Sequence, residues 1–281
     1  MSLPHDPLWP RAGDWPAPSG PADVALVGVP TWRTSLSPTK AFQTPDAVRA
    51  ALRRYSLETA LRIADAGNAV DPDDTPATEF IAALDAALVI ALGGDNAVTV
   101  PVALGRWGSS IGSAGLVTVD AHHDLRDGTS NGSPVRQLLD AGLDGRRVVQ
   151  VAIEPLANSP AYRARAAEHG ITVIERDVLR HRPIEDVMAE ALELASGGGP
   201  VHVDLDVDAC DRAVAPACPA SVPGGLSAIE LRAAARAAGA HPAVTSIDLT
   251  EIDASADTPD GRTVRLAALC VLEAIRGRAS A

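Results

Sequence analysis

Short apolar runs recur along the chain with segments of helical periodicity between them, and this alternation constrains the fold more than any other sequence feature. The apolar runs have the length of buried strands and lie at 24–29, 87–92, 115–119, 148–153, 171–174, 201–205 and 244–249. The helical segments lie at 45–61, 133–141, 160–168, 183–194, 228–238 and 263–275. The alternation predicts an α/β fold with three α/β/α layers, in which helices enclose a mainly parallel central sheet.

The domain organisation follows from length and composition. A chain of 281 residues fits one α/β domain, which we place at 23–281. Residues 1–22, which are rich in Pro, Gly and Trp, are predicted to form an irregular arm lying on that domain. Segments 71–78 and 206–225 are rich in turn-forming residues. The second is too long for an ordinary connection, which is typical of a functional loop.

Charge and lysine content exclude several classes of function. Acidic groups outnumber basic ones by 36 to 24, and the net charge of -12 argues against a surface that neutralises nucleic-acid phosphates. Lys40 is the only lysine, which leaves almost no place for Schiff-base chemistry or a Walker-type phosphate lysine. A small-molecule partner is therefore favoured.

The cysteines and the N-terminal sequence indicate the compartment. Cys210, Cys218 and Cys270 are odd in number and lack C-x-x-C spacing, which argues against a disulfide framework or a thiolate zinc site. We expect structural cysteines in a reducing cytoplasm. The first residues lack a basic start followed by an apolar run, and no segment approaches the ~20 apolar residues that span a bilayer. We therefore expect a protein that is neither exported nor embedded in a membrane.

Acids are concentrated just after four of the predicted strands. In parallel sheets, ligands bind where strands end at the carboxyl edge, so we expect these residues to share one rim. The sequences concerned are GGDN at 93–96, DAHHDLR at 120–126, DLDVD at 204–208 and LTE at 249–251. So many neighbouring acids repel one another unless cations lie among them.

Two divalent metal ions satisfy this requirement. Their four positive charges match four carboxylates, for example Asp120, Asp124, Asp206 and Asp208. A single imidazole, from His122, among mostly oxygen ligands favours manganese. Two such ions can share a water, lower its pKa and present hydroxide to a planar electrophilic carbon.

The order of these motifs resembles the arginase, agmatinase and formimidoylglutamase superfamily. The resemblance extends from about residue 23 onward and includes DLDVDACDRAVAPACPASVPGG at 204–225. It implies an arginase-like fold, two Mn²⁺ ions and a homo-oligomer. It also implies six metal ligands. Asp120 and Asp206 bridge the ions, Asp124 and Asn96 bind one of them, and His122 and Asp208 bind the other.

Three positions depart from the superfamily pattern. Asn96 stands where a histidine is usual, which weakens one metal site because an amide oxygen is a poorer ligand than imidazole. Asp204 occupies a position usually filled by a small polar residue. Arginases carry a proton-transfer histidine in the loop after the DAHxD motif, where this chain has Asn131-Gly132-Ser133, which argues against an arginase proper.

The loop at 124–136 instead resembles formimidoylglutamase, which converts N-formimidoyl-L-glutamate and water into L-glutamate and formamide during histidine degradation. We expect Arg126 or Arg136 to bind a substrate carboxylate, with Asn131 and Ser133 in the same loop also binding substrate. Glu251 is expected to pair with the cationic amidine and Asp124 to relay a proton to the departing nitrogen. Asp124 and Glu251 are therefore the predicted catalytic residues.

Several alternatives remain open at this point. The substrate is alternatively agmatine or another guanidino compound, and the chain is alternatively a metal-poor relative that binds a ligand without turnover. For Asn96, the alternative is a cap on a helix that starts at Ala97. For Glu251, it is a solvated acid at a strand end. For Arg126 and Arg136, it is ion pairing at the protein surface. A catalytic contribution from His123 is also open.

Overall fold

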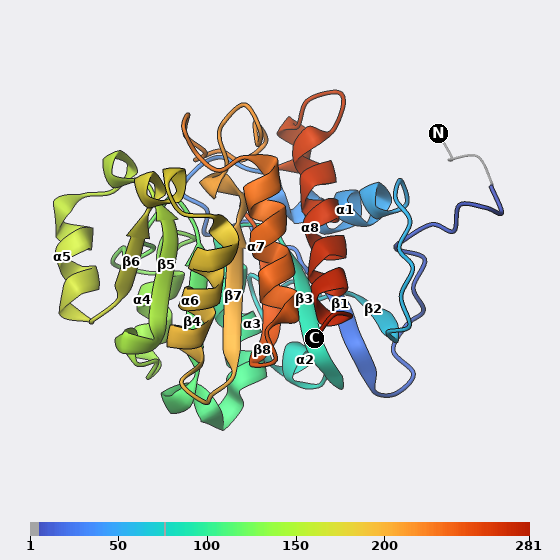
Figure 1. Ribbon diagram of the computed structural model, residues 1–281, viewed down its shortest axis with the longest axis horizontal. Coiled ribbons are helices and arrows are strands. Elements are labelled where there is room, and N and C mark those ends of the chain that lie inside the picture. The colour runs from blue at the N-terminus through green and yellow to red at the C-terminus, as the bar shows by residue number, and fades with distance from the viewer. Residues whose placement is uncertain (1–5, 76) are drawn as a thin grey trace.

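The computed structural model describes residues 6–75 and 77–281, and within these ranges eight strands form one sheet (Figure 1). All neighbouring strands pair in parallel, in the order β2-β1-β3-β8-β7-β4-β5-β6. The strands are β1 (Ala22–Val29), β2 (Ile63–Asn68), β3 (Ala86–Gly93), β4 (Gly115–Val119), β5 (Val148–Ile153), β6 (Thr172–Glu175), β7 (Val201–Asp206) and β8 (Val244–Thr250). The predicted parallel sheet is confirmed.

Helices cover both faces of the sheet and complete the three predicted layers (Figure 1). One layer consists of α6 (Ile184–Ser196), α7 (Ala228–Ala240), α8 (Arg262–Arg278) and α1 (Thr44–Leu52), which pack against one another in that order. The opposite layer contains α2 (Thr78–Ala82), α3 (Thr99–Trp107) and α4 (Pro134–Asp140), and α5 (Pro160–Glu168) packs beside β6. No helix within the described ranges is long and apolar enough to cross a lipid bilayer.

The outermost strand on the β1 side and the adjoining helix differ from the sequence prediction. The segment predicted as one helix at 45–61 is helical only as far as Leu52, and β2 follows at Ile63–Asn68. β2 has the sequence IADAGN and only its first two residues are buried, because it lies at the edge of the sheet. An edge strand with small side chains has no continuous apolar run, which is why the pattern did not reveal it.

The arm and the long loop both lie on the body of the molecule. In the arm, the Ala12 N–H donates to the Tyr55 carbonyl at 3.0 Å, and Pro16 accepts from the Asp65 N–H at 2.9 Å. The loop after β7 folds back on itself through a 2.9 Å bond from the Asp211 N–H to the Leu226 carbonyl. All three cysteines are buried and free.

Candidate active site

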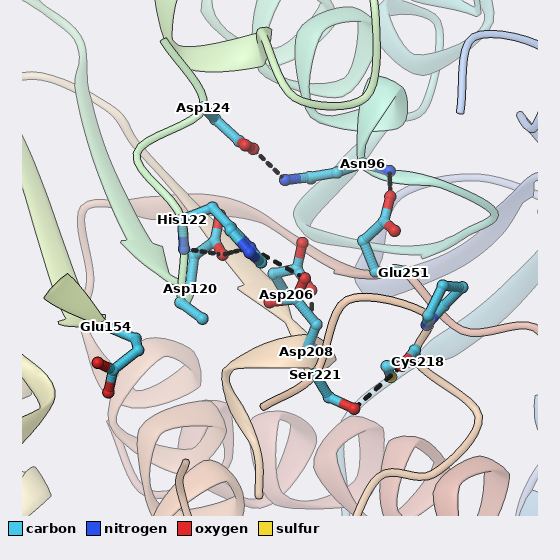
Figure 2. A network of polar contacts seen from close by, with 12 residues as sticks. Asn96, Asp120, His122, Asp124, Glu154, Asp206, Asp208, Cys218, Ser221 and Glu251 are labelled. Carbon is cyan, nitrogen blue, oxygen red and sulfur yellow. Dashed lines mark hydrogen bonds and ion pairs between the residues drawn. The ribbon is translucent and has the colours of Figure 1, made fainter. Parts of the chain in front are cut away.

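Four adjacent strands deliver polar side chains to one edge of the sheet. β3, β8, β7 and β4 are neighbours in the strand order, and because they are parallel their carboxyl ends meet at the same edge. Figure 2 shows side chains gathered there from segments far apart in the sequence. They are Asn96 after β3, Asp120, His122 and Asp124 after β4, Asp206 and Asp208 at the end of β7, and Glu251 after β8. The structure thus brings all six predicted metal ligands and Glu251 to one place.

Asp120, His122 and Asp208 form a compact cluster with the donor set of a metal site. One ligand atom from each lies within 4.8 Å of the others. The His122 Nδ1 atom is 3.1 Å from Asp208 Oδ2 and 3.4 Å from Asp120 Oδ1. Two buried carboxylate oxygens, Asp120 Oδ2 and Asp208 Oδ1, have no hydrogen-bond partner among the described residues. Buried carboxylate oxygens are costly without a partner, so these residues fit a divalent cation.

The electrostatics of the cluster support the same conclusion. Burial raises the pKa of Asp120 to about 6 and, together with the nearby Asp208, raises the pKa of Asp206 well above its usual range. The charge of Asp208 raises the pKa of His122 to about 12. Burial opposes the ionisation of Asp208, but the charge and hydrogen bond of His122 hold its pKa below the ordinary value. Without a metal, the negative charge of these buried carboxylates is reduced only by protonation and by the imidazolium of His122. Divalent cations would compensate that charge more fully.

Asn96 links the other two acids of the site. Its Nδ2 donates to Asp124 Oδ2 at 2.6 Å, and its Oδ1 accepts from Thr99 Oγ1 at 2.7 Å. Its backbone N–H donates to Glu251 Oε1 at 2.7 Å. The side chain makes no helix-capping bond, and Asp95 occupies the capping position. The geometry therefore does not support the alternative that Asn96 serves only as a helix cap.

Both predicted catalytic acids adopt a left-handed backbone conformation, which residues other than glycine rarely adopt. The φ angle is 53° at Asp124 and 62° at Glu251. Such left-handed conformations cost of the order of 1 kcal/mol or more and persist only where the surroundings enforce them. Glu251 is 6% exposed, and the Asn131 Nδ2 donates to its Oε1 at 2.7 Å. Glu251 is therefore a held, buried acid and not a solvated strand-end residue.

A cavity of about 150 Å³ opens onto these acids. Its lining includes His122 and four acids, Asp124, Asp206, Asp208 and Glu251, together with Leu36, Arg126, Asn131 and Tyr162. Burial raises the pKa of Glu251 to about 8, with nearby Asp208 adding to the effect. A small molecule in this cavity meets the carboxyl groups of Asp124, Asp206, Asp208 and Glu251.

Arg126 supplies the opposite charge. Its guanidinium carbon lies 6.0 Å from the centroid of the Tyr162 ring, a cation-π arrangement. Within the described ranges its side chain makes no hydrogen bond and no ion pair, in contrast to most arginines of this acidic chain. An unpaired guanidinium on a cavity wall can receive a carboxylate in bidentate fashion.

The other predicted substrate-binding residues of this loop lie differently. Asn131 lines the cavity, but Ser133 is fully buried, and its hydroxyl donates to the Ser130 carbonyl at 2.9 Å. Arg136 is also absent from the lining and donates to the carbonyls of Arg126 and Gly128. Direct substrate contact by Ser133 and Arg136 thus lacks geometric support.

His123 points away from the site although its neighbour His122 belongs to it. It is 1% exposed, and its Nδ1 lies 2.6 Å from Gln150 Oε1 on β5. Burial lowers its pKa. The side chain therefore links the loop after β4 to β5 and is not part of the cavity lining.

Some residues of the site were not among those predicted to bind metal or substrate. Tyr162 and Leu36 line the cavity, and Asp204, fully buried, has Oδ2 3.5 Å from Asn96 Nδ2. Burial and the neighbouring Asp248 raise the pKa of Asp204 well above its usual range. Asp204 was visible as a departure from a motif, and Tyr162 lies in the first turn of α5. Leu36 carries no signal in the sequence.

The sequence is similar to that of known proteins along most of its length. Residues 22–276 match the model of the arginase family. The formimidoylglutamase of Bacillus subtilis (strain 168) is 31% identical over 90% of this chain and 86% of its own length. The guanidinobutyrase of Pseudomonas aeruginosa is 30% identical over 92% of this chain and 89% of its own length.

The same relationship is seen in three dimensions. The crystal structure of the Bacillus subtilis formimidoylglutamase superposes with a TM-score of 0.89 and 28% identity, covering 99% of this chain and 94% of that one. Sequence and fold thus match the arginase family along nearly the whole chain. The chain therefore belongs to the arginase family and is a hydrolase of carbon–nitrogen bonds in amidines.

Proposed function

We propose that the protein hydrolyses N-formimidoyl-L-glutamate to L-glutamate and formamide with the help of two Mn²⁺ ions. The observation that carries the proposal is the unpaired Arg126 guanidinium in the lining of a cavity that is also lined by four acids. The substrate has the complementary polarity, since its amidine is cationic and its glutamate part bears two carboxylates. The similarity to formimidoylglutamases supports the same assignment.

The metal ligands proposed are the acids and the imidazole gathered at the sheet edge: Asp120, His122, Asp124, Asp206 and Asp208, with Asn96 as a sixth. Asn96 is the weakest of these because Thr99 already occupies one lone pair of its Oδ1. A single imidazole among oxygen donors favours manganese. Divalent cations held by these residues would supply positive charge and lower the pKa of a bound water.

The chain's own acids orient the substrate and move its proton. Glu251 Oε1 is engaged by Asn96 and Asn131, whereas Oε2 makes no hydrogen bond among the described residues and is available to the amidinium. Water adds to the amidine carbon, and the bond from that carbon to the glutamate nitrogen breaks. Asp124 is proposed to carry the proton from the attacking water to the departing nitrogen, which leaves as the amine while the carbon is released as formamide.

A product assay tests the substrate. Purified protein with added Mn²⁺ is incubated with N-formimidoyl-L-glutamate, 4-guanidinobutyrate, agmatine and arginine, and formamide, urea and ammonia are measured. We expect formamide from the first compound at a kcat/KM well above that for the others. Urea as the main product, from any of the others, contradicts the proposal.

A metal analysis tests the cofactor and the non-catalytic alternative together. We expect about two manganese ions per chain in protein loaded with Mn²⁺ and then desalted, and loss of activity after chelation. Full activity in thoroughly chelated protein contradicts the metal mechanism. Protein that takes up no manganese favours a relative that binds its ligand without turnover.

Guanidinobutyrate hydrolysis is the second candidate, because that substrate also joins a cationic group to a carboxylate and a guanidinobutyrase is among the similar proteins. Agmatine fits the site less well because it has no carboxylate to pair with Arg126. The assay above separates the candidates by product, since guanidino substrates release urea.

A further inference from the structure

The loop that carries Arg126 is held by two other arginines. It connects β4 to α4, and its backbone carbonyls point toward side chains of α4 and α5. Arg165 on α5 donates through Nη1 to the Leu125 carbonyl at 2.6 Å and to Asp127 Oδ1 at 2.8 Å. Arg136 on α4 donates through Nε to the Arg126 carbonyl at 2.7 Å and through Nη2 to the Gly128 carbonyl at 2.5 Å. The carbonyls of Leu125, Arg126 and Gly128 therefore each accept a hydrogen bond from one of these two arginines.

Two neighbouring residues make room for the Arg126 side chain and contact it on the cavity wall. A Cβ atom at Gly132 would lie 2.7 Å from Arg126 Cδ and 3.0 Å from Arg126 Nε, so the absence of a side chain at Gly132 leaves room for the arginine. Tyr162 supplies a ring beside the guanidinium. Tyr162 and Arg165 are three residues apart on α5 and so lie on the same side of the helix. Helix α5 thus contacts the Arg126 guanidinium through Tyr162 and binds the backbone of the Arg126 loop through Arg165.

We propose that Arg136 and Arg165 are positioning residues that make the site select amidines bearing a carboxylate. They do so by fixing the loop at 125–128, so that the Arg126 guanidinium is presented to the cavity before substrate arrives. The inference rests on the proposed function, in which Arg126 binds a substrate carboxylate. A preorganised cation binds more tightly than a mobile one because less conformational entropy is lost on binding.

The physical chemistry of the two side chains suits this role. Guanidinium donates from several N–H groups in a rigid plane, which lets one side chain hold two acceptors at once. Arg136 uses its remaining nitrogen on Asp140, and Arg165 uses the same nitrogen for both acceptors. Both charges are thereby balanced by neighbouring aspartates, so neither arginine competes with Arg126 for the substrate.

The test compares two substrates in variants of α5. The substrates are N-formimidoyl-L-glutamate and N-formimidoylpropylamine, which lacks both carboxylates. Arg165→Ala is expected to raise KM for the first on the order of tenfold, with kcat little changed, as expected for one freed side chain. Its kcat/KM for the second should stay within about twofold of the unmodified enzyme, and Arg165→Lys should restore part of the loss.

Arg163→Ala is the matched control. Arg163 lies on the same helix, is exposed, and makes no side-chain hydrogen bond or ion pair among the described residues. Its removal changes the charge of α5 by the same amount and should leave both substrates unaffected. Thermal melts of all variants distinguish a folding defect from a change in substrate binding. A folding defect lowers the rates for both substrates by the same factor.

A double variant decides whether the arginines act through Arg126. In an Arg126→Ala background, adding Arg165→Ala or Arg136→Ala should not raise KM further, because the group they position is gone. Full additivity in this background, or equal effects of Arg165→Ala on the two substrates, overturns the inference. Failure of the unmodified enzyme to release formamide overturns the proposed function instead, so the two failures are distinguishable.

Discussion

Glu251 shows how one residue is prepared for its role by its neighbours. Two donors, the Asn96 backbone N–H and Asn131 Nδ2, hold the same oxygen at 2.7 Å each, and a left-handed backbone turns the side chain inward. These contacts leave the second oxygen for a substrate cation. The same logic distinguishes His122 from His123, because neighbouring residues at a strand end project in different directions and only one faces the acids.

A charge-removing substitution tests the role of Glu251. Glu251→Gln keeps an oxygen for Asn96 and Asn131 but places a neutral amide against the cationic amidine. We expect kcat/KM to fall on the order of 100-fold, the value of a lost charge-assisted hydrogen bond, with manganese content unchanged.

Glu154→Gln is the control for that substitution. Glu154 stands at the end of β5, its side chain points away from the cluster in Figure 2, and its Oε1 accepts the Leu156 N–H at 3.1 Å. Steady-state kinetics should show no effect there. A Glu251→Gln enzyme with undiminished kcat/KM would remove Glu251 from the mechanism.

At the scale of elements, β7 and β8 carry a buried polar layer beneath the active site. His202 on β7 lies 3.1 Å from Asp248 Oδ2 through Nε2 and 2.8 Å from Ser246 Oγ through Nδ1, and all three residues are inaccessible to solvent. Asp248 is also paired in register with Asp204, which approaches Asn96. The two strands that supply metal ligands and Glu251 are thus joined by side chains as well as by backbone bonds.

Removing Asp248 should destabilise the protein. Asp248→Ala leaves a nitrogen of His202 buried without its partner, and we expect the free energy of unfolding to fall by about 2–4 kcal/mol. Asp248→Asn retains an oxygen acceptor and should cost less. Urea denaturation measures both.

Asp177→Ala provides the surface comparison for this experiment. The Asp177 side chain is 82% exposed, so the change should stay within about 0.5 kcal/mol. Equal losses for Asp248→Ala and Asp177→Ala would show that the buried layer contributes nothing to stability.

Across the whole molecule, the site concentrates acids in the interior at the expense of stability. Folding raises the pKa of Asp120 from 3.8 to about 6 and that of Glu251 from 4.5 to about 8, in both cases chiefly through burial. A carboxyl whose pKa is raised by folding stabilises the folded state fully below its unfolded pKa. That stability is lost as pH rises through the folded pKa, because the ionised acid is then buried.

The expected outcome is a pH-dependent stability that metal suppresses. Between about pH 5 and pH 8.5, the melting temperature of chelated protein should fall as pH rises, by several degrees. Protein saturated with Mn²⁺ should melt at a higher temperature and depend less on pH, since the cations compensate the ionised acids. Scanning calorimetry at several pH values measures both; parallel curves with and without metal contradict the idea.

The sequence predicted the buried central strands correctly but not the partly exposed edge strand β2. The central strands appear as apolar runs because both of their faces are covered, and all of them were predicted. β2 was missed because it lies at the edge of the sheet and its residues are small. The predicted helix at 45–61 was too long because Leu57 and Leu61 continue the apolar spacing, although they pack on the core from a loop. Apolar spacing alone does not distinguish these cases.

By itself, the sequence determined which residue types follow which strands, because strand ends and the acids beyond them are local features. That was enough to predict a parallel α/β sheet, a metal-binding edge and the acids that form it. Only the tertiary structure decided that β3, β8, β7 and β4 lie side by side, that Arg126 faces the cavity while Arg136 clasps its backbone, and that Asn96 bridges Asp124 to Thr99. Those outcomes depend on contacts between residues distant in the chain and on side-chain direction, neither of which is encoded in local spacing.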